Sequence, residues 1–266
     1  MRRPKHLSSV LFMNAIANVS DRRFSVVLPC YNEAENIVQL VEEIVAAMTG
    51  DSSEVQLFEV IIVDDCSDDG TSEAVRQHFP IADAPVRVVR HAANYGQSAA
   101  ICSGVAAATF PWIITLDGDG QNDPADIPKL IARLASAPSD AGSPMICGQR
   151  VNRRDDWLRK FSSKVANAVR AKLLGDATPD TGCGLKLFAT DAFQYFPQFD
   201  HMHRFLPALA KREGGYVESV AVNHRPRIHG VSKYGLNNRL WVGLVDLCGV
   251  MWLQRRKFRG RDSQQS

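Results

Sequence analysis

Oxygen-bearing side chains stand at every second position of the stretch TLDGDGQNDP, residues 115–124. Asp117, Asp119 and Gln121 alternate with glycines directly after an apolar run. Alternate side chains of an extended backbone point the same way, so the two carboxylates and the amide are expected to converge. Such an all-oxygen set suits Mg²⁺ or Mn²⁺ with open positions for phosphate oxygens. The alternative, an Asp/Gly-rich turn capped by Asp123, explains the glycines but not the alternation.

Two earlier apolar runs also end in polar residues. The stretch PCYNEAEN offers Tyr31 for stacking and Glu33 as a hydrogen-bond acceptor, and DDCSDDGT places Asp64 and Asp65 at the end of a second run. A carboxylate there can accept hydrogen bonds from a ribose or a base. Alternatively, the SDD residues only cap the helix that follows. Three polar strand ends in succession predict a nucleotide site.

The elements that must position these residues follow from hydrophobic periodicity. Strands are expected at 24–29, 58–64, 86–90, 111–117 and 145–150, and helices at 34–48, 71–79, 96–108 and 126–136. Asn32 is the expected cap of the first helix, with Glu35 completing a capping box. Short strands alternating with helices predict β-α-β units and a mostly parallel sheet covered on both faces. In such sheets, ligands bind beyond the carboxyl ends of the strands.

The regular alternation of strands and helices does not continue after Arg150. We expect a basic helix at 155–175, a strand in GCGLKLFA, a helical stretch at 191–213 and an edge strand at 216–227. The second half of the chain is expected to complete the sheet and to form a wall of one open site. The expected organisation is a flexible extension 1–22, a single domain 23–235, an amphipathic helix 236–258 and a tail 259–266.

Composition is compatible with one large domain, because 266 residues with 45% hydrophobic content can bury a full core. The net charge of +2 is segregated: residues 1–149 carry −9 and residues 150–266 carry +11. An acidic half suits a metal, and a basic half suits phosphates, anionic lipid or nucleic acid, unless solvated faces merely differ in charge. Six cysteines without C-x-x-C spacing predict reduced thiols.

Several function classes are disfavoured by missing motifs. No G-x-G-x-x-G follows the first strand, and neither a P-loop nor a G-x-S-x-G elbow is present. These absences argue against dinucleotide oxidoreductases, P-loop kinases and serine hydrolases of the nucleophile-elbow type. The sequence contains no run of 18 apolar residues, so it predicts no membrane-spanning helix.

Six motifs together resemble a known family. They are VVLPCYNEAENI, VIIVDDCSDDGT, NYGQSAAICSGVAAA, ITLDGDGQNDP, GCGLKLF and RIHGVSKYG. In this order, over residues 24–235, they are similar to inverting family-2 glycosyltransferases of the GT-A fold, and within these to the polyprenyl-phosphate glycosyltransferases related to dolichyl-phosphate mannose synthase. That family usually has bulkier residues where this chain has Gly118 and Gly120, which bears on the fit of the sugar but not on the metal.

The resemblance implies a fold and roles for particular residues. The fold would be a single α/β domain of the GT-A (Rossmann-like) type, with a mostly parallel mixed sheet and helices on both faces. Base and ribose of a nucleotide sugar would be held by Pro29, Tyr31, Glu33 and Asp65, and Mg²⁺ or Mn²⁺ on its diphosphate by Asp117, Asp119 and Gln121. Acceptor phosphate and leaving diphosphate would be bound by Arg150, Arg159, Arg227, Ser232 and Lys233. The residues implied to be catalytic are Asp119, Arg150, Arg227 and Lys233.

The implied reaction is metal-dependent, inverting transfer of a sugar from a UDP- or GDP-sugar to a polyprenyl phosphate, which supplies cell-envelope glycan or lipid modification. Because the acceptor phosphate is already an anion near neutral pH, it needs little or no general base. Transfer to a glycan hydroxyl is the alternative, and it would need a base, for which Asp180 is the candidate. A non-catalytic nucleotide-sugar or membrane-binding scaffold is a third reading, which the intact Asp117, Asp119 and Gln121 argue against.

The stretch LWVGLVDLCGVMWL, residues 240–253, bears on where the protein works. It is too short to span a bilayer, and tryptophans at both ends with flanking basic residues fit a helix at a lipid interface. A core helix or an oligomer contact is the alternative. Many members of the family add two membrane helices after this point; this sequence ends, so we expect peripheral attachment to the cytoplasmic face of the membrane or dependence on a membrane partner or a homo-oligomer. We expect no nucleic-acid partner.

Overall fold

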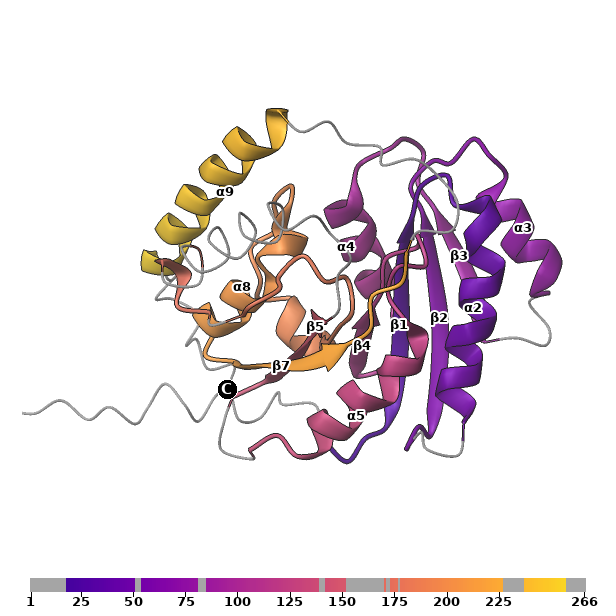
Figure 1. The fold of residues 1–266 in the computed structure, drawn as a ribbon, viewed down its shortest axis with the longest axis horizontal. Coiled ribbons are helices and arrows are strands. Elements are labelled where there is room, and N and C mark those ends of the chain that lie inside the picture. The colour runs from indigo at the N-terminus through magenta and orange to yellow at the C-terminus, as the bar shows by residue number, and fades with distance from the viewer. Residues whose placement is uncertain are drawn as a thin grey trace, which may run out of the picture.

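The computed structural model describes residues 18–50, 54–80, 85–138, 142–151, 170, 173–176, 178–226 and 237–256. Seven strands form one sheet in the order β3-β2-β1-β4-β6-β5-β7 (Figure 1). The strands are β1 (Arg23–Cys30), β2 (Leu57–Asp64), β3 (Val86–Arg90), β4 (Trp112–Thr115), β5 (Pro144–Arg150), β6 (Lys186–Ala189) and β7 (Tyr216–Val222). Only β6 among these runs antiparallel to its neighbours, β4 and β5.

Helices cover both faces of the sheet (Figure 1). The longer helices are α2 (Ala34–Thr49), α3 (Thr71–His78), α4 (Gln97–Ala107), α5 (Ile127–Ala135), α8 (Leu206–Arg212) and α9 (Asn237–Arg255), and a short α7 spans Thr190–Phe193. One hydrophobic core joins α2, α3 and α5 to the sheet, and the other joins α4, α8 and α9. Val26 and Val27 of β1 enter different cores, as expected for a central strand with both faces buried. The mixed α/β sheet expected from the sequence is confirmed.

The register of the central strands brings their carboxyl ends to one edge. Cys30 pairs with Asp64, so β1 and β2 end level with each other. Thr115, the last residue of β4, pairs with Val27, and the chain continues beside β1, where the Leu116 amide donates to the Val27 carbonyl oxygen at 3.2 Å. The residues after β4 therefore run alongside the end of β1.

The expected and observed elements agree closely up to β5. After β5 the helical stretch expected at 191–213 is divided into α7, a 3₁₀ turn and α8, and the strand expected at 216–227 ends at Val222. The expected cap of α2 is wrong. Glu33 occupies the cap position without a side-chain hydrogen bond to the helix, and Asn32 has a left-handed backbone with φ of 54°. The Ala34 amide instead donates to an Asp69 carboxylate oxygen at 2.9 Å, and Asp69 also accepts from the Thr71 amide at 3.0 Å. The loop after β2 thus supplies the cap for α2. Most of the predicted helix at 155–175 lies outside the described residues.

Helix α9 packs one side against the domain and leaves the other side uncovered. Leu247, Val250 and Met251 join the core beneath it. The opposite side forms an outward stripe of Leu244, Val245, Cys248, Gly249 and Trp252 that ends in Arg255 and Arg256. Asp246, the acidic residue of this helix, faces inward and pairs with His201 at 3.2 Å. Within the described part of the chain, no helix is both long enough and apolar enough to cross a bilayer.

Candidate active site

Two cavities meet at Asp117, at the edge where β1, β2 and β4 end. The first, called here the Tyr31 cavity, has a volume of about 290 Å³ and is lined by residues including Pro29, Tyr31, Glu33, Asp65, Asp117 and Asp119. The second, called the Lys186 cavity, has a volume of about 360 Å³ and is lined by residues including Gln97, Asp117, Thr181, Lys186, His203 and Arg204. Pro29, Gln97 and Asp117 line both, so the two cavities adjoin around Asp117.

The loop after β4 places two of its three oxygen-bearing side chains in one cavity. Extended backbone ends at Thr115 and a turn follows at residues 118–120, so the alternation of a strand does not continue to Gln121. Asp117 and Asp119 line the Tyr31 cavity, whereas Gln121 is not among the described residues that line the Tyr31 cavity or the Lys186 cavity. The Gln121 amide donates to Asp119 Oδ1 at 3.1 Å, which fixes the second carboxylate in the turn.

The two glycines of this loop serve different purposes. Gly120 has φ of 71°, which makes the turn possible. Gly118 lies against the end of β1, where an added Cβ would stand 2.5 Å from Cys30 Sγ and 3.1 Å from the Pro29 carbonyl oxygen. The close approach that Gly118 permits is therefore between two parts of the protein, the end of β1 and the loop after β4.

Asp117 is held in place and carries a perturbed pKa. Its Oδ1 accepts from Gln97 Nε2 at 2.7 Å, and the Gly184 backbone lies directly against the carboxylate. Burial, followed by the charge of Asp119, raises the pKa of Asp117 to about 6, although Lys186 and Arg150 act in the opposite direction. A buried carboxylate with a raised pKa beside a second carboxylate is the electrostatic setting that a divalent cation relieves.

The donor set fits a hard cation that also takes ligands from its substrate. No group of three His, Cys, Asp or Glu side chains arranged for a metal occurs among the described residues. Asp117 and Asp119 would thus supply two carboxylates, and the remaining oxygens would come from an amide, water or phosphate, as is usual for Mg²⁺ at phosphate sites. The residues present fit such an ion.

Asp65 lines the Tyr31 cavity and also organises the loop that follows β3. Its Oδ1 accepts from the Tyr95 amide at 2.8 Å and lies 2.7 Å from His91 Nδ1, and its Oδ2 accepts from the Gly96 amide at 2.7 Å. The other ring nitrogen of His91 lies 2.8 Å from Ser103 Oγ. Sequence reasoning missed His91, whose only signal was a polar residue directly after a predicted strand.

Arg150, expected to bind phosphate, is engaged by the protein itself. Its Nε and Nη2 donate to the two oxygens of Asp180 at 2.7 and 2.8 Å, and its amide donates to Asp180 Oδ2 at 3.1 Å. Burial acts to lower the pKa of Arg150, but the hydrogen bonds with Asp180 outweigh it and raise that pKa. The pair ties the end of β5 to the 180–184 loop, where an added Cβ at Gly182 would stand 3.1 Å from Arg150 Nη2. The other expected phosphate-binding residues, Arg159, Arg227, Ser232 and Lys233, lie outside the described residues.

Basic residues that the sequence reasoning missed line the Lys186 cavity. Lys186 opens β6 with only 4% of its surface exposed, and its ammonium donates to the Cys183 carbonyl oxygen. Arg204 ends the short 3₁₀ turn Met202–Arg204. Burial, then the charges of Arg204 and Lys186, lower the pKa of His203 to about 3, so its ring is neutral, and Nδ1 lies 2.8 Å from Ser98 Oγ. The signal for Lys186 was a single charge inside the apolar run GLKLFA.

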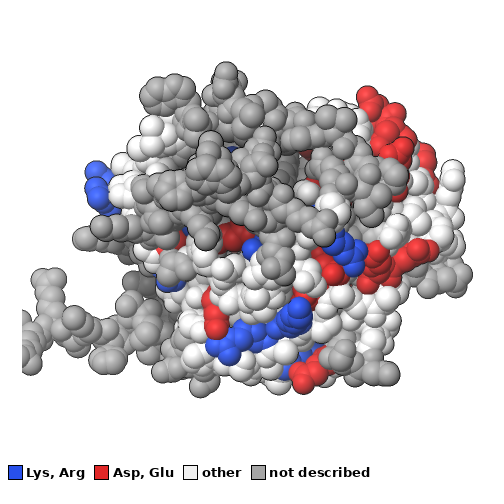
Figure 2. Space-filling view, in the orientation of Figure 1, with Lys and Arg blue, Asp and Glu red and all other residues white. Residues whose placement is uncertain are grey.

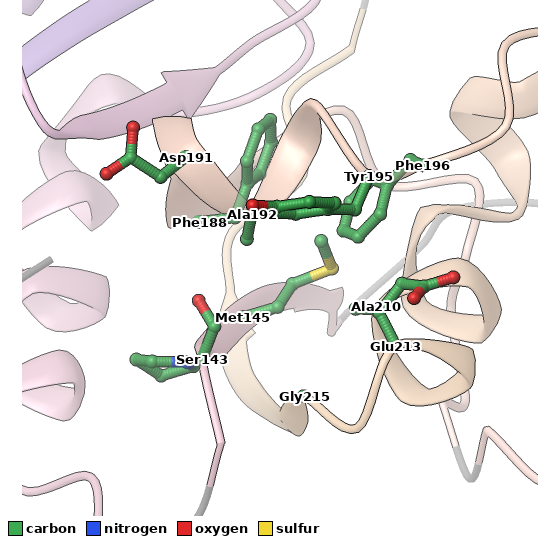
Figure 3. Close-up of a pocket in the computed structure, with 11 residues that line it drawn as sticks. Ser143, Met145, Phe188, Asp191, Ala192, Tyr195, Phe196, Ala210, Glu213 and Gly215 are labelled. Carbon is green, nitrogen blue, oxygen red and sulfur yellow. The ribbon is translucent and has the colours of Figure 1, made fainter. Parts of the chain in front are cut away.

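A third pocket lies at the opposite end of β5 and differs in character (Figure 3). It has a volume of about 30 Å³, and Met145 points toward the rings of Tyr195 and Phe196. The carboxylates of Asp191 and Glu213 lie on opposite sides of it and do not converge (Figure 3). This pocket lacks the grouped polar side chains of the cavities at Asp117.

The mostly parallel sheet with carboxylates at its strand ends has the GT-A fold, which solved structures share. Glucosyl-3-phosphoglycerate synthase from Mycobacterium tuberculosis, in complex with Mn²⁺, UDP-glucose and phosphoglyceric acid, matches with a TM-score of 0.66 at 16% identity, over 97% of this chain and 88% of that chain. Mannosyl-3-phosphoglycerate synthase from Rubrobacter xylanophilus matches with a TM-score of 0.66 at 14% identity, over 92% and 82%. At these identities the likeness shows the fold.

The chain belongs to glycosyl transferase family 2, whose family model matches residues 25–196. A dodecaprenyl-phosphate galacturonate synthase of Rhizobium johnstonii is 36% identical over 247 residues, covering 91% of this chain and 70% of that protein. An undecaprenyl-phosphate 4-deoxy-4-formamido-L-arabinose transferase of Aeromonas hydrophila is 34% identical over 219 residues, covering 82% of this chain and 65% of that protein. The chain thus spans about two thirds of the length of these relatives, both of which are named as polyprenyl-phosphate sugar enzymes. The glycosyltransferase class expected from the sequence is confirmed.

Proposed function

We propose that this chain transfers a sugar from a UDP- or GDP-sugar to a polyprenyl phosphate, with inversion at the anomeric carbon. The observation that carries the proposal is the meeting of two cavities at Asp117, beside Asp119. A nucleotide sugar has the same layout, with a base and ribose at one end, a sugar at the other and a diphosphate between them. The names of the two relatives supply the acceptor class.

The donor would lie across both cavities. Tyr31, 36% exposed, offers a ring on which a base can stack, and Pro29 forms the wall beside it. Glu33 and Asp65 carry acceptor oxygens for ribose hydroxyls or base N–H groups. The sugar would then enter the Lys186 cavity.

The diphosphate would lie at Asp117 and Asp119, which, with Gln121, would hold Mg²⁺ or Mn²⁺. When bound, the ion offsets the negative charge that builds up on the leaving nucleoside diphosphate. Gln97 fixes the orientation of Asp117 through its 2.7 Å hydrogen bond, and the Gln121 amide fixes Asp119. These residues hold the carboxylates ready before the donor arrives, which lowers the cost of ordering the site.

The acceptor would approach from the side of the 180–184 loop as an anion that needs no deprotonation. Arg227, Ser232, Lys233 and Arg159 are proposed to meet its phosphate, while Arg150 supports the loop and contributes positive charge. Asp180, the candidate base for a hydroxyl acceptor, has both oxygens bound to Arg150. That pairing favours a phosphate acceptor over a glycan hydroxyl, because a carboxylate held by a guanidinium is a weak base.

Because polyprenyl phosphates reside in membranes, the protein must work at a lipid surface. We propose peripheral attachment to the cytoplasmic face of the membrane through the outward stripe of α9. The stripe is apolar except at its end, where Arg255 and Arg256 can meet anionic headgroups.

The test is a transfer assay with a short polyprenyl phosphate, Mg²⁺ or Mn²⁺, and a panel of UDP- and GDP-sugars, with the lipid product weighed by mass spectrometry. We expect a product heavier than the carrier by one sugar residue. Donor binding without any lipid product would instead support a scaffold, and sugar found only on a glycan hydroxyl would contradict the phosphate acceptor.

Asp180 separates the two acceptor classes directly. Asp180→Asn removes the ion pair and leaves the buried Arg150 without its partner, so we expect the free energy of unfolding to fall by roughly 3 kcal/mol. A catalytic base needs a free carboxylate, whereas both oxygens of Asp180 are bound to Arg150, so Asp180 is not expected to act as the base. We therefore expect residual activity with an unchanged pH profile after correction for folded protein. An activity loss of more than about a thousandfold in fully folded Asp180→Asn would restore the hydroxyl-acceptor alternative.

A further inference from the structure

The Lys186 cavity contains a buried ammonium that the protein itself leaves incompletely bonded. Lys186 is 4% exposed and lies between buried Leu185 and Leu187, opposite Thr115 of β4. An ammonium has three donor hydrogens. Within the described part of the chain, its hydrogen-bond acceptor is the Cys183 carbonyl oxygen, and no carboxylate lies within 4.0 Å of it. Donor capacity therefore remains on a side chain that lines the cavity.

Such a residue is costly in a core strand. Removing an ammonium from water without a paired anion costs several kcal/mol, and an apolar side chain would complete β6 at lower cost. Lys186 does act on Asp117 from a distance, since its charge opposes the rise in the pKa of that carboxyl. That effect does not require the ammonium to line a cavity of about 360 Å³.

Arg204 adds a second cation to the same cavity wall. Among the described residues, no hydrogen bond or ion pair is made by its guanidinium, and its backbone carbonyl oxygen accepts from Arg170. A guanidinium presents paired N–H groups that match a carboxylate or phosphate. The acidic residue that lines this cavity is Asp117, which the proposed function assigns to the diphosphate.

The position of these cations along the donor identifies their ligand. With the nucleoside in the Tyr31 cavity and the diphosphate at Asp117 and Asp119, the part of the donor that enters the Lys186 cavity is the sugar. A neutral hexose would itself offer no anion to these two cations. We infer that the donor sugar is acidic, a hexuronate whose carboxylate is bound by Lys186 and Arg204. This inference rests on the proposed function for the order in which the donor lies.

The acceptor phosphate is the other anion that could reach these cations, so the experiment must separate the two sources. Donor pairs that differ only at C6 provide the comparison: UDP-glucuronate with UDP-glucose, UDP-galacturonate with UDP-galactose, and GDP-mannuronate with GDP-mannose. For each pair, the ratio of kcat/KM for the acidic donor to that for the neutral donor is measured at fixed polyprenyl phosphate. The KM for polyprenyl phosphate is measured separately.

We expect the wild type to favour the acidic member of at least one pair by tenfold or more. Lys186→Met and Arg204→Met should each lower this ratio by roughly ten- to hundredfold, the range for one lost charge-assisted hydrogen bond. Lys186→Arg, which keeps the charge, should retain part of the preference. Lys211→Met is the matched control, because Lys211 lines neither cavity and its ammonium donates to the Gly175 carbonyl oxygen; it should keep the wild-type ratio.

Calorimetric titration of each donor in Mn²⁺ without lipid provides a readout that does not depend on transfer. If no lipid product forms, the proposed function fails, yet tighter binding of acidic donors that Lys186→Met removes would still support the carboxylate site. Equal binding of acidic and neutral donors by the wild type would overturn it. An unchanged donor ratio in both variants would also overturn it, including when the KM for polyprenyl phosphate rises, which would assign the cations to the acceptor.

Discussion

At the scale of single residues, Asp117 combines three constraints. It lies where the two cavities meet, it is fixed by Gln97, and its pKa is raised to about 6 by burial and by Asp119. A carboxyl whose folded-state pKa exceeds its unfolded value of 3.8 binds its proton more tightly in the folded state. Stability from this group is therefore highest at low pH and is lost as the pH rises from about 4 through about 6. Above pH 6 the ionised Asp117 destabilises the metal-free protein.

Asp117→Asn should consequently stabilise the metal-free protein at pH 7.5, by up to about 3 kcal/mol, and give no gain at pH 4. The asparagine keeps an oxygen for the hydrogen bond from Gln97. Urea unfolding in EDTA at the two pH values measures the difference, with Asp191→Asn, an exposed carboxylate on α7, as the control. A variant that is less stable than the wild type at pH 7.5 would contradict the raised pKa. Added Mn²⁺ should stabilise the wild type more than the variant.

Residue types at the strand ends predicted that Tyr31, Glu33 and Asp65 share the Tyr31 cavity, whereas Pro29 was implied by the family resemblance alone. Asp64, predicted together with Asp65, is instead fully buried and accepts a hydrogen bond from the Ser67 amide. Pro29, Tyr31, Glu33 and Asp65 come from two strand ends, and parallel strands bring their ends together whatever the details of packing. Gln121 does not line that cavity, and the strand alternation from which its convergence with the two aspartates was predicted ends where the backbone turns at residues 118–120. The roles of these residues in binding stay predictions.

The sequence carries a signal for Lys186, but it does not predict that Lys186 and Arg204 line the same cavity. Lys186 and Arg204 are isolated basic residues in otherwise apolar or mixed segments. They reach the cavity through the antiparallel strand β6 and the turn before α8. Sequence periodicity locates a strand or a helix, but it does not say which distant segment will close a cavity.

At the scale of elements, the site depends on contact between the end of β1 and the loop after β4. Gly118 is the point of contact, since its position leaves no room for a Cβ beside Cys30 and Pro29. The same interdependence explains the cap of α2. Asp69, from the loop after β2, satisfies the Ala34 amide, a contact between residues 35 positions apart. Rules based on local sequence predict Asn32 as the cap of α2 because they consider only residues that are neighbours in the chain.

Gly118→Ala should separate these two strand ends, because the added methyl carbon would stand 2.5 Å from Cys30 Sγ. We expect the free energy of unfolding to fall by about 1–3 kcal/mol and donor binding to weaken, since Asp117 and Asp119 flank the displaced position. The double variant Gly118→Ala with Cys30→Ala removes the sulfur and should recover part of the loss in chemical unfolding. If the loss of unfolding free energy in the double variant equals the sum of the losses in the two single variants, the contact between residue 118 and Cys30 is not the cause.

At the scale of the whole molecule, charge and apolar surface are unevenly distributed. On the face shown in Figure 2, acidic residues gather over the loop that links β2 to α3, and basic residues lie lower, near β7 and α5. Helix α5 belongs to the half of the sequence that is acidic overall, so this view is no test of the charge segregation predicted between the two halves. For residues 240–253 the sequence offered a lipid-facing helix, a core helix or an oligomer contact, and α9 has one apolar side in the core and one exposed side. The apolar inward side explains why the sequence alone could not separate them.

The outward stripe of α9 leads to a prediction about membrane binding. Leu244 and Trp252 are 49% and 59% exposed, so replacing both by serine should weaken partitioning onto anionic vesicles by tenfold or more. Replacing Arg255 and Arg256 by glutamine should reduce the salt dependence of binding. Leu57→Ser, which changes an apolar residue 56% exposed at the start of β2, is the control. If the stripe variants bind vesicles normally and instead dissolve a dimer, the stripe is an interface between copies of the chain.

The proposed transfer depends on Asp117 and Asp119 holding the diphosphate of a sugar donor. The most direct test is the rate of transfer from a nucleotide sugar to a short polyprenyl phosphate by Asp119→Asn, with Asp191→Asn as the control and circular dichroism to verify folding. We predict that Asp119→Asn is folded and that its kcat/KM falls by about a thousandfold or more, whereas the control keeps wild-type activity. A folded Asp119→Asn protein that transfers sugar at the wild-type rate would contradict the account.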